Sequence, residues 1–262
     1  MEKEGQYIYC IIDTKQERNF GPIGLGGEDV LTLGYNDLSM VVSSRPLTKV
    51  AVSRENMLAH QKVVEEVMRE FDSVLPARFG SIAASADEIR NLLDRRCVEF
   101  KTALRDMDHK VELGVKGRWL AMDAVFKEIT DEHKEIRKLK EKLQNDSGGN
   151  PARKGFSNGV QAKMEVGRMV AQALAKKKEL EAEKIVDAFR RTASDCKLNQ
   201  TFGDEMFINA AFLVDKGREK EFDNIMDDLH QACKASIKFA YAGPLPVYNF
   251  VTIEIHPEEW EK

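Results

Sequence analysis

The feature that most constrains the fold is a change of hydrophobic period along the chain. Apolar runs of the length of a strand occur towards both ends, at 6–12 (QYIYCII), 207–214 (FINAAFLV) and 248–255 (YNFVTIEI). Between them, apolar residues recur every three or four positions through most of 119–196, as they do on one face of a helix. Strands that flank a long helical segment favour an α+β fold.

The first part of the chain mixes strands and helices. The runs 30–33 and 38–43 flank a turn-forming tetrapeptide and predict a β-hairpin. Ser53 can cap a helix that extends to about residue 71. A short strand is predicted at 74–82, and the capping box at 85–88 begins a helix that keeps its apolar spacing to about residue 107.

The middle of the chain predicts an antiparallel helical hairpin. Within 119–143, apolar residues fall on alternate three- and four-residue steps, which is a short heptad seam with Glu132 at the one missing step. Loop-forming residues at 144–158 separate this seam from a second helical pattern that runs to about Cys196.

The remaining elements complete a second α+β unit. Alternation at 110–116 predicts a half-buried strand before the hairpin, and a helix over 216–233 and a strand at 237–241 come after the strand at 207–214. The sequence therefore predicts an N-terminal α+β domain at 1–108 and a C-terminal α+β domain at 109–262. The second domain contains the helical hairpin at 119–196.

The charges exclude some functions. Charged residues make up 32% of the chain, above the usual value of about 25%, which predicts long solvated helices. The net charge is 40 − 44 = −4, so no overall positive field favours nucleic acid or anionic lipid.

No apolar stretch is long enough for a membrane span, and acids stand where a secretory signal needs basic residues. Four dispersed cysteines fit reduced thiols, and the chain is expected to be cytosolic.

A search for catalytic, cofactor or metal chemistry finds none. The glycines at 21–27 precede a strand pattern rather than a helix, so they do not form a phosphate cradle. The five histidines are scattered, and His60 lies on an apolar helix face, as a hydrogen-bonded core histidine would. No nucleophile elbow is present. The residues favour a protein that is not an enzyme and has no cofactor.

Two segments remain unexplained by this search, at 75–81 (LPARFGS) and 242–251 (AGPLPVYNFV). Alternation places Arg78 on the opposite face from Ala77 and Phe79, where it either pairs with a carboxylate or faces a partner. The prolines at 244 and 246 cannot join a central ladder, so this segment is expected at an edge or a bend. It is either a fixed surface turn or a docking site.

At these segments the chain resembles the gas vesicle protein F/L family. The resemblance spans nearly the whole length. It includes a YIY opening at 7–9, LAHQKVVE at 58–65, VLPARFGS at 74–81, KVELGVK at 110–116 and AGPLPVYNFV at 242–251. The chain departs from the family at Ala77, where a methionine-like residue is frequent, and at Leu245, where tryptophan is frequent.

The resemblance implies a minor structural component that acts in gas vesicle assembly, within the cytoplasm. Its implied partners are the main gas vesicle shell protein, which it would keep from aggregating during nucleation, and other gas vesicle accessory proteins. It also implies a C-terminal domain with a modified ferredoxin-like fold, and no catalytic residues or cofactors. The candidate interaction or family-motif residues are Leu75, Pro76, Arg78, Phe79, Gly80, Gly243, Pro244, Pro246 and Tyr248.

A mechanism follows from the helical hairpin. Its many Met and Leu residues allow a helix-in-groove contact with an apolar shell subunit. The alternative is that these residues fill the seam of the hairpin and the domain core. A small-molecule-binding regulator on a ferredoxin-like scaffold is the other functional hypothesis, and it would need a polar pocket.

Overall fold

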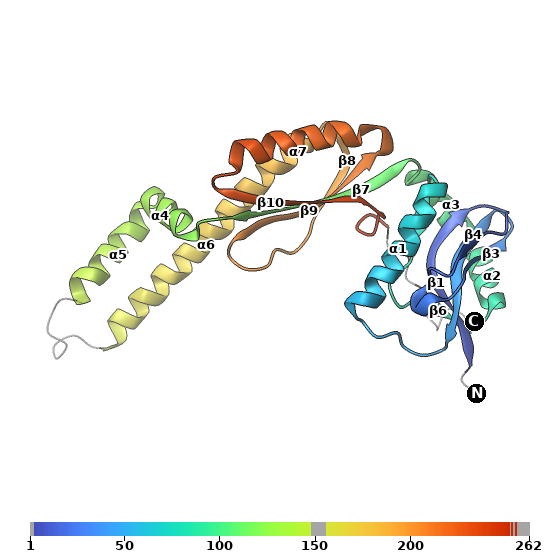
Figure 1. Cartoon of the computed structure of the whole chain (residues 1–262). Coiled ribbons are helices and arrows are strands. Elements are labelled where there is room, and N and C mark those ends of the chain that lie inside the picture. Colours follow the sequence, from blue (N-terminus) through green and yellow to red (C-terminus); the bar gives the residue numbers. More distant parts are fainter. Residues whose placement is uncertain (1–2, 148–155, 252, 254, 256–262) are drawn as a thin grey trace.

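The computed structural model describes residues 3–147, 156–251, 253 and 255. The molecule is elongated, with a sheet at each of two positions along its length and a pair of long helices that extends beyond the second sheet (Figure 1). Both sheets contain only antiparallel pairs of strands. The α+β class predicted from the sequence is confirmed at this level.

The first sheet has the strand order β2-β3-β4-β1-β5, and β6 pairs separately with β1. The hairpin predicted at 30–43 is confirmed, with Tyr35 opposite Leu38 at its closed end. The strands are β1 (Glu4–Asp13), β2 (Asn19–Gly21), β3 (Val30–Tyr35), β4 (Leu38–Pro46), β5 (Val74–Pro76) and β6 (Ile82–Ala83), with the short 3-10 helix η1 (Leu25–Gly27) before β3.

Helices cover both faces of this sheet. On one face α1 (Arg54–Glu70) packs its valines against Tyr7 and Tyr9 of β1, and the Ser53 hydroxyl accepts from the N–H of Asn56 as the predicted cap. On the other face, α2 (Ala86–Arg95) and α3 (Cys97–Asp106) pack against Ile8 and Ile11 of β1, which flank a bulge, and against alternate residues of β4. The sequence predicted one helix here. The backbone breaks it at Arg96, with φ −103° and ψ 19°.

The strand predicted at 74–82 is also interrupted. After β5 the chain turns, because the carbonyl of Arg78 accepts from both the N–H and the hydroxyl of Ser81. Gly80 in this turn has φ +89°, a conformation that glycine adopts without strain.

The second sheet has the order β10-β7-β9-β8. Its strands are β7 (Lys110–Trp119), β8 (Ala193–Leu198), β9 (Met206–Asp215) and β10 (Ile237–Leu245), and α7 (Glu219–Cys233) follows β9 after the 3-10 helix η2 (Lys216–Arg218). The end of α6 (Phe156–Phe189) and α7 pack on one face of this sheet. At the centre of this core, the rings of Phe189 and Phe222 stack with centroids 3.9 Å apart, and the Phe212 ring lies against both.

Two sequence predictions in this region are wrong. The helix expected to reach Cys196 ends at Phe189, and β8 follows it. β8 (ASDCKL) is a mostly exposed edge strand, so it carries no apolar alternation. The strand expected at 248–255 is a turn at 248–250, where the carbonyl of Val247 accepts from the N–H groups of Phe250 and Val251, and positions 252 and 254 lie outside the described residues. Only the Ala77–Ile253 bridge is β-like among its described residues.

Beyond the second sheet, α4 (Met122–Glu132) and α5 (Lys134–Ser147) lie beside the N-terminal part of α6 (Figure 1). We call these three helical segments the arm. The predicted heptad seam does not form one helix, because the helical backbone breaks at His133. This break lies next to Glu132, the one position of the seam that is not apolar. Its buried members still face inward, and Ile129 and Ile136 share a core with Leu174 of α6. None of the described helices is long and apolar enough to cross a membrane.

Candidate functional site

The two segments that the sequence left unexplained meet in the structure. The chain leaves β10, the edge strand of the second sheet, at a bulge between Ala242 and Leu245, and returns to the first sheet. There Ile253 bridges Ala77, and its carbonyl accepts from the N–H of Arg78 at 3.4 Å. We call the segments 75–81 and 243–253, with the groups that contact them, the joint. The expectation of an edge or a bend at Gly243–Pro246 is confirmed.

On the side of the first sheet, the joint contains buried polar side chains. The Tyr7 hydroxyl lies 2.9 Å from Nδ1 of His60 and accepts from the N–H of Gly80 at 3.0 Å. The Phe79 ring packs edge-on against the Tyr7 and His60 rings, and the Tyr248 ring lies 6.3 Å from the His60 ring. Among the described residues, Nε2 of His60 and the Tyr248 hydroxyl have no hydrogen-bond partner.

Burial keeps these groups neutral. It lowers the pKa of His60 to about 4, against a smaller opposing effect of the Ala77 carbonyl. It also raises the pKa of the Tyr7 and Tyr248 hydroxyls above their usual range. A neutral histidine that contacts tyrosine and phenylalanine rings suits a structural core, as expected for His60. No group of three or more His, Cys, Asp or Glu side chains in the described part of the chain is arranged to hold a metal ion.

On the side of the second sheet, Glu112 of β7 anchors the returning chain. Its carboxylate accepts from the backbone N–H of Asn249 at 2.8 Å and from Nδ2 of the same residue at 2.6 Å. Glu112 is only 4% exposed, and burial raises its pKa while the Asn249 hydrogen bonds lower it. A carboxylate with two donors from one residue fixes the position of the turn at 248–250.

The structure places the predicted motif residues around this joint. Leu75 and Pro76 are buried in β5, Arg78 is exposed and Phe79 is half-buried, so the predicted alternation around Arg78 is present. Gly243 and Pro244 are exposed at the bulge, Pro246 is buried, and Tyr248 is half-buried. Whether any of them contacts a partner stays a prediction.

Sequence reasoning missed the polar partners of these motifs. Glu112 lies in an alternating strand, where its position predicts a solvated carboxylate, and nothing in the strand itself identifies Asn249 as its donor. Close packing also holds Gly243, where an added Cβ would lie 2.5 Å from Cδ2 of Leu113, but this contact is visible only in the structure. A glycine required by such close packing indicates that the strand continues into a fixed contact.

The arm contains a groove between α5 and α6. A cavity of about 500 Å³ near the start of α5 adjoins a second of about 550 Å³ further along, and they share Glu135, Met169 and Gln172. The floor is apolar, with buried Ile136 and half-buried Leu139, Met169 and Ala173. The other lining residues are Glu132, His133, Lys134, Lys138, Lys142, Glu165, Arg168 and Lys176. An apolar floor between charged walls suits an amphipathic helix better than a small polar ligand.

Comparison with known proteins identifies the family. The family model described as "Gas vesicle synthesis protein GvpL/GvpF" matches residues 5–252. Gas vesicle protein F of a Streptomyces species is 29% identical over 248 residues, which cover 94% of this chain and 98% of that protein. Gas vesicle protein F1 of Halobacterium salinarum is 28% identical, with 98% and 97% covered.

Solved structures show the same fold. The crystal structure of GvpF from a species of Anabaena has a TM-score of 0.80 at 21% identity, and the match covers 96% of this chain and 100% of that one. GvpF from Microcystis aeruginosa has a TM-score of 0.75 at 18% identity, with 94% and 98% covered. The family points to a role in gas vesicle assembly rather than in catalysis. The resemblance seen in the sequence is thus confirmed, and the chain belongs to the family of gas vesicle synthesis proteins GvpL and GvpF.

Proposed function

We propose that this protein binds the hydrophobic shell-forming protein of gas vesicles, together with other accessory proteins, and keeps the shell protein from aggregating while a vesicle nucleates. Its place would be at the gas vesicle, within the cytoplasm. The observation that carries the proposal is the match of nearly the whole chain, residues 5–252, to the gas vesicle synthesis family. A shell subunit that is apolar on one face needs such a partner, because exposed apolar surface drives aggregation.

The groove of the arm is the proposed contact. Its floor of Ile136, Leu139, Met169 and Ala173 can accept the apolar side of a helix, while the charged walls stay in water. Val160 and Met164 extend this surface, because they precede Arg168 on α6 at four-residue steps and are 51% and 70% exposed. Exposed methionine adapts its shape to different partners.

The competing explanation is that these side chains serve only to hold α5 against α6. The two explanations differ in what a charge on the groove floor does. If the floor binds the shell protein, a carboxylate there costs the complex about 2 kcal/mol or more, because it is buried without a partner. If the floor only holds the arm together, the same change lowers the stability of the arm and leaves binding intact.

The test is a sedimentation assay with purified shell protein. Shell protein alone is expected to pellet, and a several-fold excess of this protein should keep it in the supernatant. Ala173→Asp should abolish that effect. Ala171→Asp is the matched control, because Ala171 lies two residues away on the exposed side of α6. Circular dichroism of both variants reports whether the arm is intact. Unchanged pelleting with the wild-type protein, or equal loss in both variants, would refute the proposal.

We also propose how the chain is divided into folding units. We propose that residues 1–108 and 109–262 are two folding units, because the described core of the second sheet comes only from the second range, although Ile253 of that range packs in the core of the first sheet. For the second unit we propose a modified ferredoxin-like fold with an inserted helical hairpin. The strand order β10-β7-β9-β8, with helices after β7 and after β9, supports this interpretation.

A further inference from the structure

In the part of the chain that the structure describes, helices cover only one face of the second sheet. Leu113 and Val115 belong to the core that α6 and α7 cover, so Gly114, Lys116 and Arg118 of the same strand point to the opposite face. On that face, Figure 1 shows no helix over the sheet. The returning chain at 246–250 lies at the Glu112 end only, where Asn249 binds Glu112.

The register shows which side chains share this open face. Lys116 lies opposite Ala240 of β10, and Arg118 lies opposite Lys238. Residues directly opposite each other in an antiparallel pair point to the same side of the sheet, with Cβ atoms about 5 Å apart. Lys116, Arg118 and Lys238 are all exposed. We call these three residues the basic face.

The basic face contains one pair of like charges directly opposite each other. Two like charges directly opposite each other destabilise a strand pair, and Arg118 and Lys238 are such a pair. Glu205 lies 3.7 Å from Arg118. Neither Lys116 nor Lys238 has an ion-pair partner among the residues that the structure describes. On the β10 side the neighbours Ala240 and Ala242 are small, and on the β9 side Lys116 lies opposite the uncharged Asn209.

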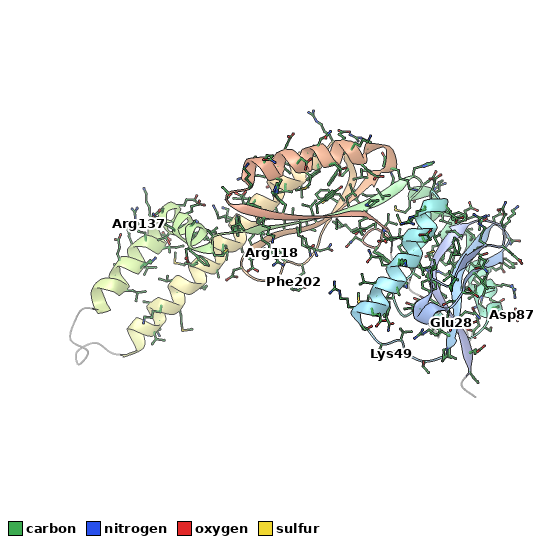
Figure 2. The ribbon with its side chains drawn as sticks, in the orientation of Figure 1. Glu28, Lys49, Asp87, Arg118, Arg137 and Phe202 are labelled. Atoms are coloured by element: carbon green, nitrogen blue, oxygen red, sulfur yellow. The ribbon has the colours of Figure 1, made fainter. Side chains whose placement is uncertain are left out.

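An exposed aromatic side chain lies beside these cations. Phe202 is 64% exposed in the loop between β8 and β9. The same loop contacts the end of β7, because the Glu205 carbonyl accepts from the N–H of Trp119 at 2.9 Å. Glu205, whose carboxylate lies near Arg118, follows Phe202 by three residues in this loop, and Figure 2 labels Phe202 and Arg118. The surface therefore combines three cations with one apolar anchor.

We propose that the basic face binds an acidic segment of a protein partner, and that an apolar residue of this segment packs on Phe202. Carboxylates of an acidic segment complement cations that lie at neighbouring positions of the sheet and reduce their mutual repulsion. Nucleic acid fits less well. The whole chain carries a net charge of −4, so no overall positive field attracts a phosphate backbone. This surface is separate from the arm groove, so the inference does not depend on shell-protein binding.

Fluorescence anisotropy with the full chain tests the inference. The probe is a labelled synthetic peptide with the sequence of residues 219–233 and serine in place of its final cysteine. It carries five carboxylates, one lysine and several apolar residues. The peptide should bind, and more weakly as salt rises. Lys116→Glu with Lys238→Glu should weaken binding by about tenfold or more, and Phe202→Ser by roughly threefold.

The matched control is Lys49→Glu with Arg54→Glu, which makes the same change of net charge at exposed positions near the start of α1. This control should bind the peptide as the wild-type protein does. An equal loss of affinity in the control would refute the inference, because it would show attraction to net charge alone. Absence of peptide binding would also refute it. So would tighter binding of a single-stranded oligonucleotide of equal charge, which would identify a nucleic-acid surface instead.

Discussion

Protonation of His60 should destabilise this protein, and the expected magnitude follows from its burial. The side chain is 3% exposed, and burial lowers its pKa to about 4. In the unfolded chain the pKa of histidine is about 6.5. Because the unfolded state takes up this proton first, the stability that is present above pH 6.5 is lost as the pH falls towards 4.

The size of the loss can be worked out for one accessible pH. At pH 5 the pH lies about 1.5 units below the pKa of about 6.5 that His60 has in the unfolded chain. At about 1.4 kcal/mol per unit, the loss of unfolding free energy is about 2 kcal/mol. Below the folded pKa the loss levels off at about 3 kcal/mol. His60→Gln removes this titration and keeps a hydrogen-bonding group near the Tyr7 hydroxyl. The wild-type protein should therefore lose about 2 kcal/mol more than His60→Gln between pH 7.5 and pH 5.

Urea unfolding at pH 7.5, 6.5, 5.5 and 5 measures this difference, because other titrating groups contribute equally to both proteins. Tyr7→Phe is the control. It removes the hydrogen bond to Nδ1 and lowers stability at every pH, but His60 stays buried, so the extra loss at low pH should remain. Parallel pH profiles for the wild-type protein and His60→Gln would refute the reasoning.

Three further outcomes test the joint and its motifs. Glu112→Ala leaves both donors of Asn249 without an acceptor and should lower the free energy of unfolding by about 2 kcal/mol or more, as measured by urea unfolding. Gly243→Ala should lower it by about 1–3 kcal/mol, because the new Cβ would meet Leu113 in a backbone conformation with φ +150°. Arg78→Ala should affect stability more than binding: the thermal midpoint should fall, while the recovery of shell protein in a pull-down should change little. Normal melting with lost recovery would contradict that last expectation.

The sequence predicted the elements whose apolar pattern is strong. β1, β9 and α1 bury most of one face or more, so their residues are restricted to apolar types at regular spacing. β8 was missed because an edge strand with polar residues has no such restriction. The break at His133 was missed because the apolar seam continues across it, from Ile129 to Ile136.

The joint was only partly predictable, for a different physical reason. Its motif segments stood out in the sequence because they combine proline and glycine with apolar residues. The partners that give these segments their geometry lie far away in the chain: Tyr7 bonds His60 and Gly80, and Glu112 bonds Asn249. Periodicity reports which side of an element is buried, but not which distant polar group completes a hydrogen bond.

If the protein holds partners, as we propose, these contacts give the motif residues a role. The segment after β10 is fixed to β7 by Glu112 and to the first sheet by the Ala77–Ile253 bridge. A rigid connection keeps the first sheet and the arm at a set separation, and two partners bound at distant surfaces are then held in a fixed relation. If the connection were loose, each contact would act alone and the gain in effective concentration would be smaller. On the proposed function, buried Pro246 and half-buried Tyr248 would serve assembly by fixing this connection, even if no partner touches them.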